Sequence, residues 1–288
     1  MSTTVLAASH PRVSAQKIDI WRLPLVTILI VSVFIIWGTL APLLAPYDPN
    51  AQNLLERLQP PSWDHWFGTD SLGRDLLSRV IFGARVSLIV VVSALIGGAL
   101  FGLSLGIIAG YFGGWVDIII SRVIDAALAI PSLFIGILLA VTLGGGVTSV
   151  VIAISMILWS RFARIIRSDV IAIKNRDFVL QAQLMGCSSL RIILVHIVPN
   201  ILSTAMVLIS INLGEVILME ASLSFLGAGV PPTTPSWGGI VAQGQAFLAT
   251  AWWLTTIPAT TILLIVLAFN ILGDWVRERL DPRLRDAV

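Results

Sequence analysis

The sequence contains few of the residues that build disulfides, metal sites and catalytic clusters. Of its 288 residues only 12% are charged, and it has one cysteine and three histidines. The single cysteine, Cys187, excludes an intramolecular disulfide and a metal site made of several cysteines. The histidines, His10, His65 and His196, are far apart in the sequence, so a histidine-based cluster is not expected. We therefore predict a chain that has no catalytic residues, binds no metal and is not an enzyme.

A nucleotide-binding loop is also missing. The phosphate-binding P-loop needs a Gly-Lys pair followed by Ser or Thr, because the lysine reaches the phosphates and the hydroxyl contacts Mg²⁺. The only lysines, Lys17 and Lys174, follow Gln16 and Ile173. The chain is thus expected to bind no cofactor of its own, and any dependence on ATP would have to come from a partner.

Hydrophobic residues, in contrast, make up 57% of the chain. A soluble domain of this size cannot bury so much apolar surface, so the composition indicates an integral membrane protein. A transmembrane helix needs about twenty apolar residues. Six candidate spans lie near residues 24–45, 84–110, 118–142, 147–166, 201–229 and 251–273. We predict that the first is a retained anchor rather than a cleaved signal peptide, because its polar leader is long.

The distribution of Lys and Arg predicts the orientation, because cytoplasmic loops are enriched in both. Basic residues gather before the first span, between Arg161 and Arg191, and after the last span, whereas Ala221–Gly273 holds no charged residue. Six spans put all three basic regions on one side, which we assign to the cytoplasm. The segment after the first span holds arginines as well, but aspartates and a glutamate offset them, and long loops obey the rule poorly.

This topology divides the chain into four parts. A cytoplasmic tail (1–23) is followed by the first span with an external segment (24–83). A five-helix core (84–273) then includes a cytoplasmic loop over residues 161–200, and a second cytoplasmic tail (274–288) ends the chain. Within the external segment, Asp70 or Ser71 is expected to cap a short helix that leads into the second span.

The second span carries glycine at every fourth position. The four residues are Gly98, Gly102, Gly106 and Gly110. This spacing puts them on one helix face, where another backbone can approach closely. We predict a tight helix–helix contact along this face, with scattered glycine as the alternative.

The fifth span carries polar residues on one face. Asn212, Glu215, Met219 and Ser222 fall at i, i+3, i+7 and i+10. A carboxylate at membrane depth costs about 2.5 kcal/mol or more, so it normally faces protein or a water-filled path. The face is therefore either a pathway lining or gate, or the site of a buried structural hydrogen bond to a neighbouring helix, and the sequence leaves both open. Arg122 and Asp125, at i, i+3 in the third span, are expected to form a local ion pair.

Residues 178–200 interrupt the apolar pattern and predict two short helices joined by a bend. Gly186 permits the bend, Ser188 or Ser189 can cap the second helix, and Pro199 is expected to end it before the fifth span begins. The apolar side chains of this segment are not needed by lipid, so they indicate a protein partner. The residues expected to make this contact are Phe178, Val179, Leu180, Gln181, Ala182, Gly186, Cys187, Ser188 and Pro199.

This segment resembles the "EAA" loop of importer permeases of the ATP-binding cassette class, whose pattern is roughly E-A-A-x-x-x-G followed by I-x-L-P. Gly186 matches the glycine and Ala182 the second alanine, whereas Leu180 stands at the glutamate position and Gln181 at the first alanine position. Residues 67–88 (FGTDSLGRDLLSRVIFGARVSL) and 220–238 (EASLSFLGAGVPPTTPSWG) are similar to the corresponding stretches of dipeptide, oligopeptide and nickel importer permeases.

The resemblance implies an all-α membrane protein with the type I importer permease fold, in a bacterial inner membrane with both termini in the cytoplasm. Its partners would be a second homologous permease, two cytoplasmic ATPase subunits that bind ATP and Mg, an extracytoplasmic solute-binding protein and the lipid bilayer, but no nucleic acid. The solute would be a di- or oligopeptide or a related small molecule. The alternative is an ion-coupled secondary transporter, whose folds usually show repeated halves and broken helices. The sequence shows no convincing repeat, and its spans are mostly uninterrupted.

Overall fold

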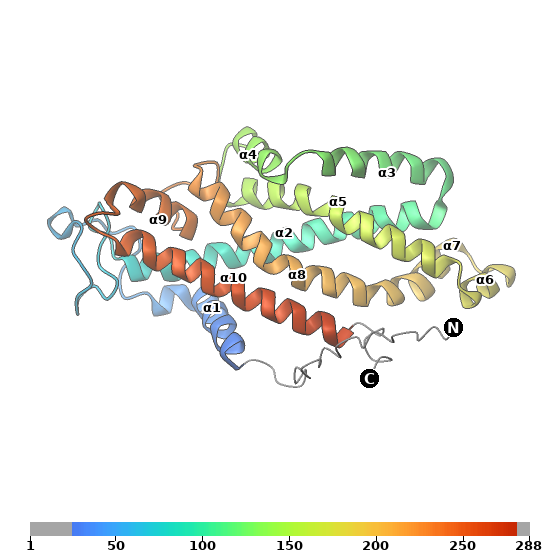
Figure 1. The fold of residues 1–288 in the computed structure, drawn as a ribbon, viewed down its shortest axis with the longest axis horizontal. Coiled ribbons are helices and arrows are strands. Elements are labelled where there is room, and N and C mark those ends of the chain that lie inside the picture. The colour runs from blue at the N-terminus through green and yellow to red at the C-terminus, as the bar shows by residue number, and fades with distance from the viewer. Residues whose placement is uncertain (1–24, 281–288) are drawn as a thin grey trace, which may run out of the picture.

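The computed structural model describes residues 25–280, which form an elongated bundle of helices (Figure 1). Five helical segments in this range are long and apolar enough to cross a membrane. They are α1 (Leu25–Leu44), α2 (Leu76–Phe112), α5 (Val147–Lys174), the continuous run Ser189–Phe225, and α10 (Trp253–Leu280). Five of the six predicted spans thus have a helical counterpart. Helices α1, α5 and α10 begin within two residues of the predicted start, whereas α2 and the run Ser189–Phe225 begin earlier than predicted.

The predicted span 118–142 is not a continuous helix. The structure divides it into α3 (Gly114–Ala129) and α4 (Ser132–Thr142), which are bent by 92° relative to each other. Pro131 causes the break: it has no N–H to donate, and it forces the preceding Ile130 into an extended conformation (φ −93°, ψ 131°). If the bent pair counts as one crossing, the bundle has six spans.

Helices α2 and α5 form the most extensive contact in the bundle, along the glycine face of α2. A Cβ atom on Gly102 would lie 2.5 Å from both the Phe162 Cβ and the Trp159 carbonyl oxygen. A Cβ on Gly106 would lie 2.8 Å from the Ala163 carbonyl oxygen. Gly98 and Gly110 face Leu158 and Val170 in the same way. All four glycines therefore lie where the two backbones approach too closely for any side chain.

One end of the bundle is covered by the segment between α1 and α2 together with α9 (Trp237–Gly244) and η3 (Gln245–Phe247); we call it the α9 end (Figure 1). The Trp237 side chain is 1% exposed, and its Nε1 donates to the Val80 carbonyl oxygen at 2.9 Å. A Cβ on Gly83 would lie 2.6 Å from the Trp237 ring. Trp237 thus fixes α9 against the beginning of α2.

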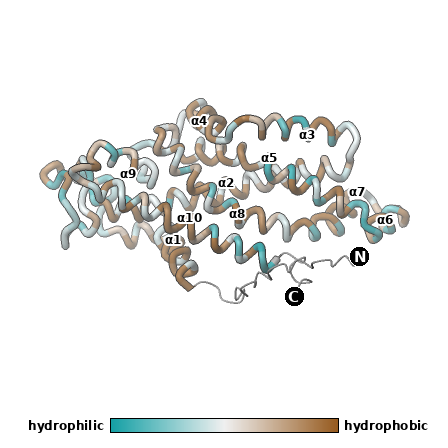
Figure 2. The backbone as a smooth tube through the Cα atoms, viewed as in Figure 1, coloured by the Kyte–Doolittle hydropathy of each residue, from teal (hydrophilic) through white to brown (hydrophobic). Residues whose placement is uncertain are grey.

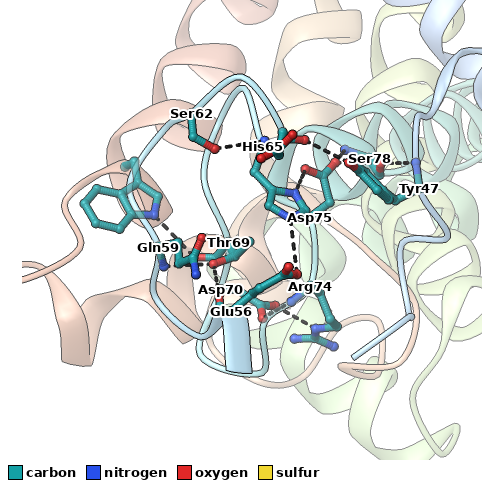
Figure 3. A network of polar contacts seen from close by, with 12 residues as sticks. Tyr47, Glu56, Gln59, Ser62, His65, Thr69, Asp70, Arg74, Asp75 and Ser78 are labelled. Atoms are coloured by element: carbon teal, nitrogen blue, oxygen red, sulfur yellow. Dashed lines mark hydrogen bonds and ion pairs between the residues drawn. The ribbon is translucent and has the colours of Figure 1, made fainter. Parts of the chain in front are cut away.

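The segment between α1 and α2, which includes η1 (Leu54–Glu56), is held by a polar network (Figure 3). His65 Nδ1 lies 2.9 Å from Asp75 Oδ1, and its Nε2 lies 3.4 Å from Glu56 Oε2. Burial lowers the pKa of His65, but hydrogen bonds and charge interactions with Asp75 and Glu56 outweigh this effect and raise the pKa above its ordinary value.

The residue that caps α2 is Asp75, not Asp70 or Ser71 as predicted. Its carboxylate accepts a hydrogen bond from the Ser78 backbone N–H at 2.8 Å. Asp70 instead accepts from the backbone N–H groups of Leu72 and Arg74, so it stabilises the turn before α2. Aspartate is a favoured N-cap residue, so either Asp70 or Asp75 could cap the helix, and the packing of the turn decides between them.

The opposite end of the bundle carries α6 (Asp177–Leu184) and α7 (Ser189–Ile192); we call it the α6 end (Figure 1). Helix α5 continues through Lys174, so the first part of the predicted loop 161–200 is helical. Figure 2 shows hydrophilic residues concentrated at α6 and at the end of α10, and hydrophobic residues over most of α1, α4 and α8 (Val198–Phe225).

Pro199 does not end a helix. It lies in the first turn of α8, and the helical run continues from Ser189 to Phe225 through the π-helical turn η2 (Ile193–Ile197). In η2 the Val198 N–H bonds to the Ile193 carbonyl oxygen, one residue farther back than in an α-helix. The prediction was wrong because the π-helical turn directly before Pro199 already departs from the α-helical hydrogen-bond pattern, so the run accommodates a proline at this point.

Candidate functional site

Helix α6 lies between α5 and the run that leads into α8, and one of its faces is buried. Val179 is 0% exposed and Ala182 is 7% exposed. Both belong to a small apolar core at the α6 end, separate from the main core of the bundle. The other members of this small core are Tyr111, Ile166, Val170, Ile173, Ile192, Ile197, Ile201 and Ala205. Helix α6 is therefore fixed to α2, α5 and α8 together.

The bend after α6 is a Schellman motif centred on Gly186. The Gly186 N–H donates to the Gln183 carbonyl oxygen at 3.0 Å, and the Cys187 N–H donates to the Ala182 carbonyl oxygen at 3.1 Å. Gly186 has φ +77°, and a Cβ placed on it would meet no atom within 4 Å. The glycine is thus required for its backbone conformation and not for space.

The residues that follow the bend continue the same motif. Cys187 packs against the small core to which Ala182 belongs. An apolar contact between these two positions commonly accompanies a Schellman motif. The Ser188 hydroxyl accepts a hydrogen bond from the Arg191 N–H and caps α7. Cys187 is therefore a packing residue, and of the two predicted caps the structure uses Ser188.

The other face of α6 and the bend expose apolar side chains. Leu184 and Met185 are 88% and 83% exposed, and Phe178, Leu180 and Leu190 are exposed as well. Gln181 lies among them on the outer side of α6. Exposed apolar residues at the tip of a membrane protein form a surface for another protein. Pro199 is exposed too but lies beyond η2, so it is not part of this surface.

In the middle of the bundle an ion pair joins α5 to α8. Arg161 Nη1 lies 2.5 Å from Glu215 Oε1 and 2.6 Å from Glu215 Oε2. Each side chain is 37% exposed in the isolated chain. Arg161 was predicted to lie in the basic loop, yet it belongs to the helical part of α5. The pair links the two helices between which α6 is inserted.

Two cavities flank this ion pair at the break between α3 and α4. The first, of about 190 Å³, is lined by Glu215, Met219 and Ser222 together with residues of α4 and Ile157. The second, of about 140 Å³, is lined by Arg161, Pro131 and residues around them. Ser132 and Ile157 line both. The broken span thus leaves space beside the ion pair.

Asn212 lies on the predicted polar face but not in either cavity. It is 7% exposed, and its amide donates to the Leu208 carbonyl oxygen at 2.7 Å. The structure therefore brings Glu215, Met219 and Ser222 together and gives Asn212 a hydrogen bond within its own helix. The predicted alternative, a hydrogen bond to a neighbouring helix, does not describe Asn212, because its bond stays within α8, whereas the other three residues line a cavity.

Two further ion pairs hold α3 against α5. Arg164 Nη2 lies 2.6 Å from Asp125 Oδ1, and Arg167 Nη2 lies 2.6 Å from Asp117 Oδ2. Asp125 thus pairs with Arg164 of α5. The sequence had suggested a pair with Arg122 instead. Arg161, Arg164 and Arg167 stand at i, i+3 and i+6. This spacing is the signal in the sequence that could have indicated a helix here, because in a helix all three residues lie toward one side.

Comparisons with known proteins give a consistent result. The family model described as "Binding-protein-dependent transport system inner membrane component" matches residues 102–286. The chain is 39% identical to the dipeptide transport system permease protein DppC of Alkalihalophilus pseudofirmus, over 97% of this chain and 92% of the relative. It is 37% identical to the oligopeptide transport system permease protein OppC of Bacillus subtilis, over 97% and 95%.

Among solved structures, a chain of the inward-facing methionine ABC transporter MetNI is similar in fold. The TM-score is 0.59 at 15% identity, and the similarity covers 72% of this chain and 98% of that chain. Most of the chain is thus built on a fold that has already been observed.

Proposed function

The chain belongs to the family of binding-protein-dependent transport system inner membrane components, and from this membership we propose that it is the permease subunit of an ATP-driven importer of di- and oligopeptides. As a family member it is a multi-pass inner membrane protein and the non-catalytic permease component of an ABC transporter complex. We propose a peptide substrate because this chain aligns with most of the length of relatives that are named for dipeptide, di/tripeptide and oligopeptide transport.

The complete complex contains a second homologous permease, two ATPase subunits that bind ATP and Mg, and a solute-binding protein on the outside. The α6 end faces the cytoplasm, the topology assigns both chain termini to the same side of the membrane, and the α9 end faces the binding protein. The exposed apolar surface around Leu184 and Met185 supports this arrangement, because it needs a protein partner at the α6 end.

The observation that carries the proposal is the position of α6. It is inserted between α5 and α8, and its buried face is fixed to both of them through Val179 and Ala182. A force applied to the exposed face of α6 by a closing ATPase therefore moves α5 and α8 as well. We assign the ATPase contact to the exposed residues Phe178, Leu180, Gln181 and Ser188, with Leu184 and Met185. Of the other residues predicted for it, Val179, Ala182 and Cys187 pack in the small core, Gly186 forms the bend, and Pro199 lies beyond η2.

The ion pair between Arg161 and Glu215 connects the same two helices. Movement of α5 relative to α8 changes its geometry and the cavities on either side of it. We assign Glu215, Met219 and Ser222 to the solute pathway and the glycines of α2 to helix packing. We assign Asn212 no part in the pathway, because its side chain forms a hydrogen bond within α8.

The alternative weighed for the sequence, an ion-coupled secondary transporter, has one feature in its favour, the 92° break between α3 and α4 beside an ion pair, but the family membership of the chain contradicts it. One experiment separates the two. The purified complex with its binding protein is reconstituted into liposomes, and uptake of a labelled dipeptide is measured. We expect uptake that needs ATP and the binding protein and that persists when ionophores collapse all ion gradients. Uptake driven by an ion gradient without ATP would overturn the importer.

Replacing Glu215 by glutamine is expected to lower peptide uptake severalfold without reducing assembly. The substitution keeps the size of the side chain but removes the charge that pairs with Arg161, so the electrostatics of the cavity lining change while the packing of α5 against α8 is kept. The measurement is ATP-driven uptake together with the yield of complex in size-exclusion chromatography.

The matched control is Asp125→Asn, which breaks the ion pair to Arg164. The side chains of Arg164 and Asp125 are 53% and 55% exposed, so the loss of their ion pair is expected to change uptake little. If Glu215→Gln lowers the yield of complex as much as uptake, then Glu215 has a structural role. If the two variants behave alike, Glu215 does not belong to the pathway.

A further inference from the structure

The largest of the cavities described here, about 480 Å³, lies at the α9 end. We call it the α9 cavity. It brings together residues 67–88 and 220–238, the two stretches that resemble importer permeases but take no part in α6 or its bend. Its wall includes Arg79, Ser224, Ala242 and Gln243 together with several glycines, among them Gly145 and Gly229. A volume of this size suits a small ligand.

Arg79 is the one charged residue in this wall. It is 1% exposed, and its Nε forms no hydrogen bond within the described part of the chain. Its Nη1 donates to the Pro49 carbonyl oxygen at 3.2 Å. A guanidinium that is removed from water in this way normally has a carboxylate or phosphate as its partner.

The carboxylate beside Arg79 is already engaged. Asp70 Oδ2 lies 2.6 Å from Arg74 Nε and 3.6 Å from Arg79 Nε, so one carboxylate serves two guanidinium groups. Arg74 also donates to Gln243 Oε1 at 3.0 Å. The group formed by Arg74, Arg79 and Asp70 therefore carries one positive charge in excess.

No other carboxylate of residues 25–280 compensates this charge through an ion pair. Asp75 accepts hydrogen bonds from Ser78 and contacts His65. Glu220 is 0% exposed, accepts from Ser87 and Ser224, and has no cation within ion-pair distance in the described part of the chain. The positive charge beside the α9 cavity is thus free to attract an anion.

We infer that the α9 cavity binds the carboxylate group of the solute as it leaves the binding protein. This inference rests on the proposed function and on the orientation that places the α9 end outside. A carboxylate suits the site because guanidinium groups bind it strongly, and because low exposure strengthens the attraction between the charges. The glycines of the wall leave room for the rest of the solute, whatever its side chains.

The test places a competing carboxylate in the cavity. Ala242 lies in the wall and is half-buried, so Ala242→Glu adds a carboxylate there, and Ala242→Gln adds a neutral group of the same size. Uptake is measured in liposomes that contain the complete complex, with the binding protein saturated by a labelled dipeptide. We expect the glutamate variant to lose at least about tenfold in uptake and the glutamine variant no more than about twofold.

A second arm uses the C-terminal amide of the same peptide, at a concentration that saturates the isolated binding protein. The amide lacks the carboxylate, so wild type is expected to import it more slowly, and Ala242→Glu is expected to reduce its uptake no more than Ala242→Gln does. Arg79→Gln should lower uptake of the acid like Ala242→Glu, and Arg79→Lys should restore part of it. If Arg79→Gln does not assemble, the Ala242 pair decides alone.

Three outcomes would overturn the inference. Equal losses in Ala242→Glu and Ala242→Gln would mean that the effect is steric. Equal effects on acid and amide, together with weaker docking of the binding protein, would assign the carboxylate to that protein. Unchanged uptake in all variants would mean that the cavity lies outside the route. Absence of ATP-driven uptake in wild type would instead contradict the proposed function.

Discussion

Leucine at position 102 is expected to prevent assembly of the transporter almost completely. A Cβ at Gly102 already lies 2.5 Å from the Trp159 carbonyl oxygen and the Phe162 Cβ, and one of these is a backbone atom that cannot rotate away. Helices α2 and α5 must therefore separate. Overpacking costs about 1–3 kcal/mol even where side chains can adjust, and here the largest helix contact of the bundle is lost. The measurement is the yield of complex after detergent extraction.

The control is Ser104→Leu, two residues farther along the same helix. Ser104 is exposed and donates only to the Leu100 carbonyl oxygen. Leucine on this side suits lipid, so membrane insertion and assembly are expected to persist. Gly102→Ala should give an intermediate yield, because it adds the clashing Cβ but none of the further atoms of leucine. A normal yield for Gly102→Leu would mean that the α2–α5 contact contributes little to assembly.

Valine at position 186 is expected to lower peptide-stimulated ATP hydrolysis and uptake by about tenfold. Gly186 has φ +77°, a conformation that costs a β-branched residue about 1–2 kcal/mol or more. No atom of the chain would contact the new Cβ, so the effect comes from the backbone and from the partner at this surface. The strain reorients α6 relative to α7 while both helices stay folded.

Two controls identify the cause. Gly186→Asn should keep most of the activity, because asparagine tolerates a positive φ. Gly113→Val, at the turn between α2 and α3, places the same residue at a positive φ (+66°, with no atom within 4 Å) outside α6 and its bend. We expect Gly113→Val to retain the coupling of hydrolysis to uptake. If Gly186→Val transports at the wild-type rate, the segment is only a connector between α5 and α8.

Local sequence signals were sufficient for several features. Helical spacing of four placed the glycines of α2 on one face, and the structure puts that face against α5. The Gly-Cys-Ser order predicted a bend and a cap, which are now seen at Gly186 and Ser188. These features depend on neighbours within a few residues, so backbone geometry alone determines them.

The site in the middle of the bundle needed the tertiary structure. Arg161 reads as one of a run of basic residues, and such runs commonly lie in a cytoplasmic loop. Its partner Glu215 belongs to a helix far along the chain, so only folding shows that the two form an ion pair. The choice of Asp75 as the cap of α2 depended in the same way on how the preceding turn packs.

By itself, the sequence determined the membrane class, the positions of the apolar helices and the family resemblance, because hydrophobicity and helical period are local properties. The two prolines show what it left undecided. Pro131 breaks a predicted span by 92°, whereas Pro199 is accommodated in a continuous run. Both lack an N–H, but Pro199 directly follows a π-helical turn, where the hydrogen-bond pattern already changes and the run continues. At Pro131 the preceding Ile130 is extended, so α3 ends there and α4 begins in a new direction. Which of the two outcomes each proline has is seen only in the tertiary structure, because the loss of the N–H is the same at both.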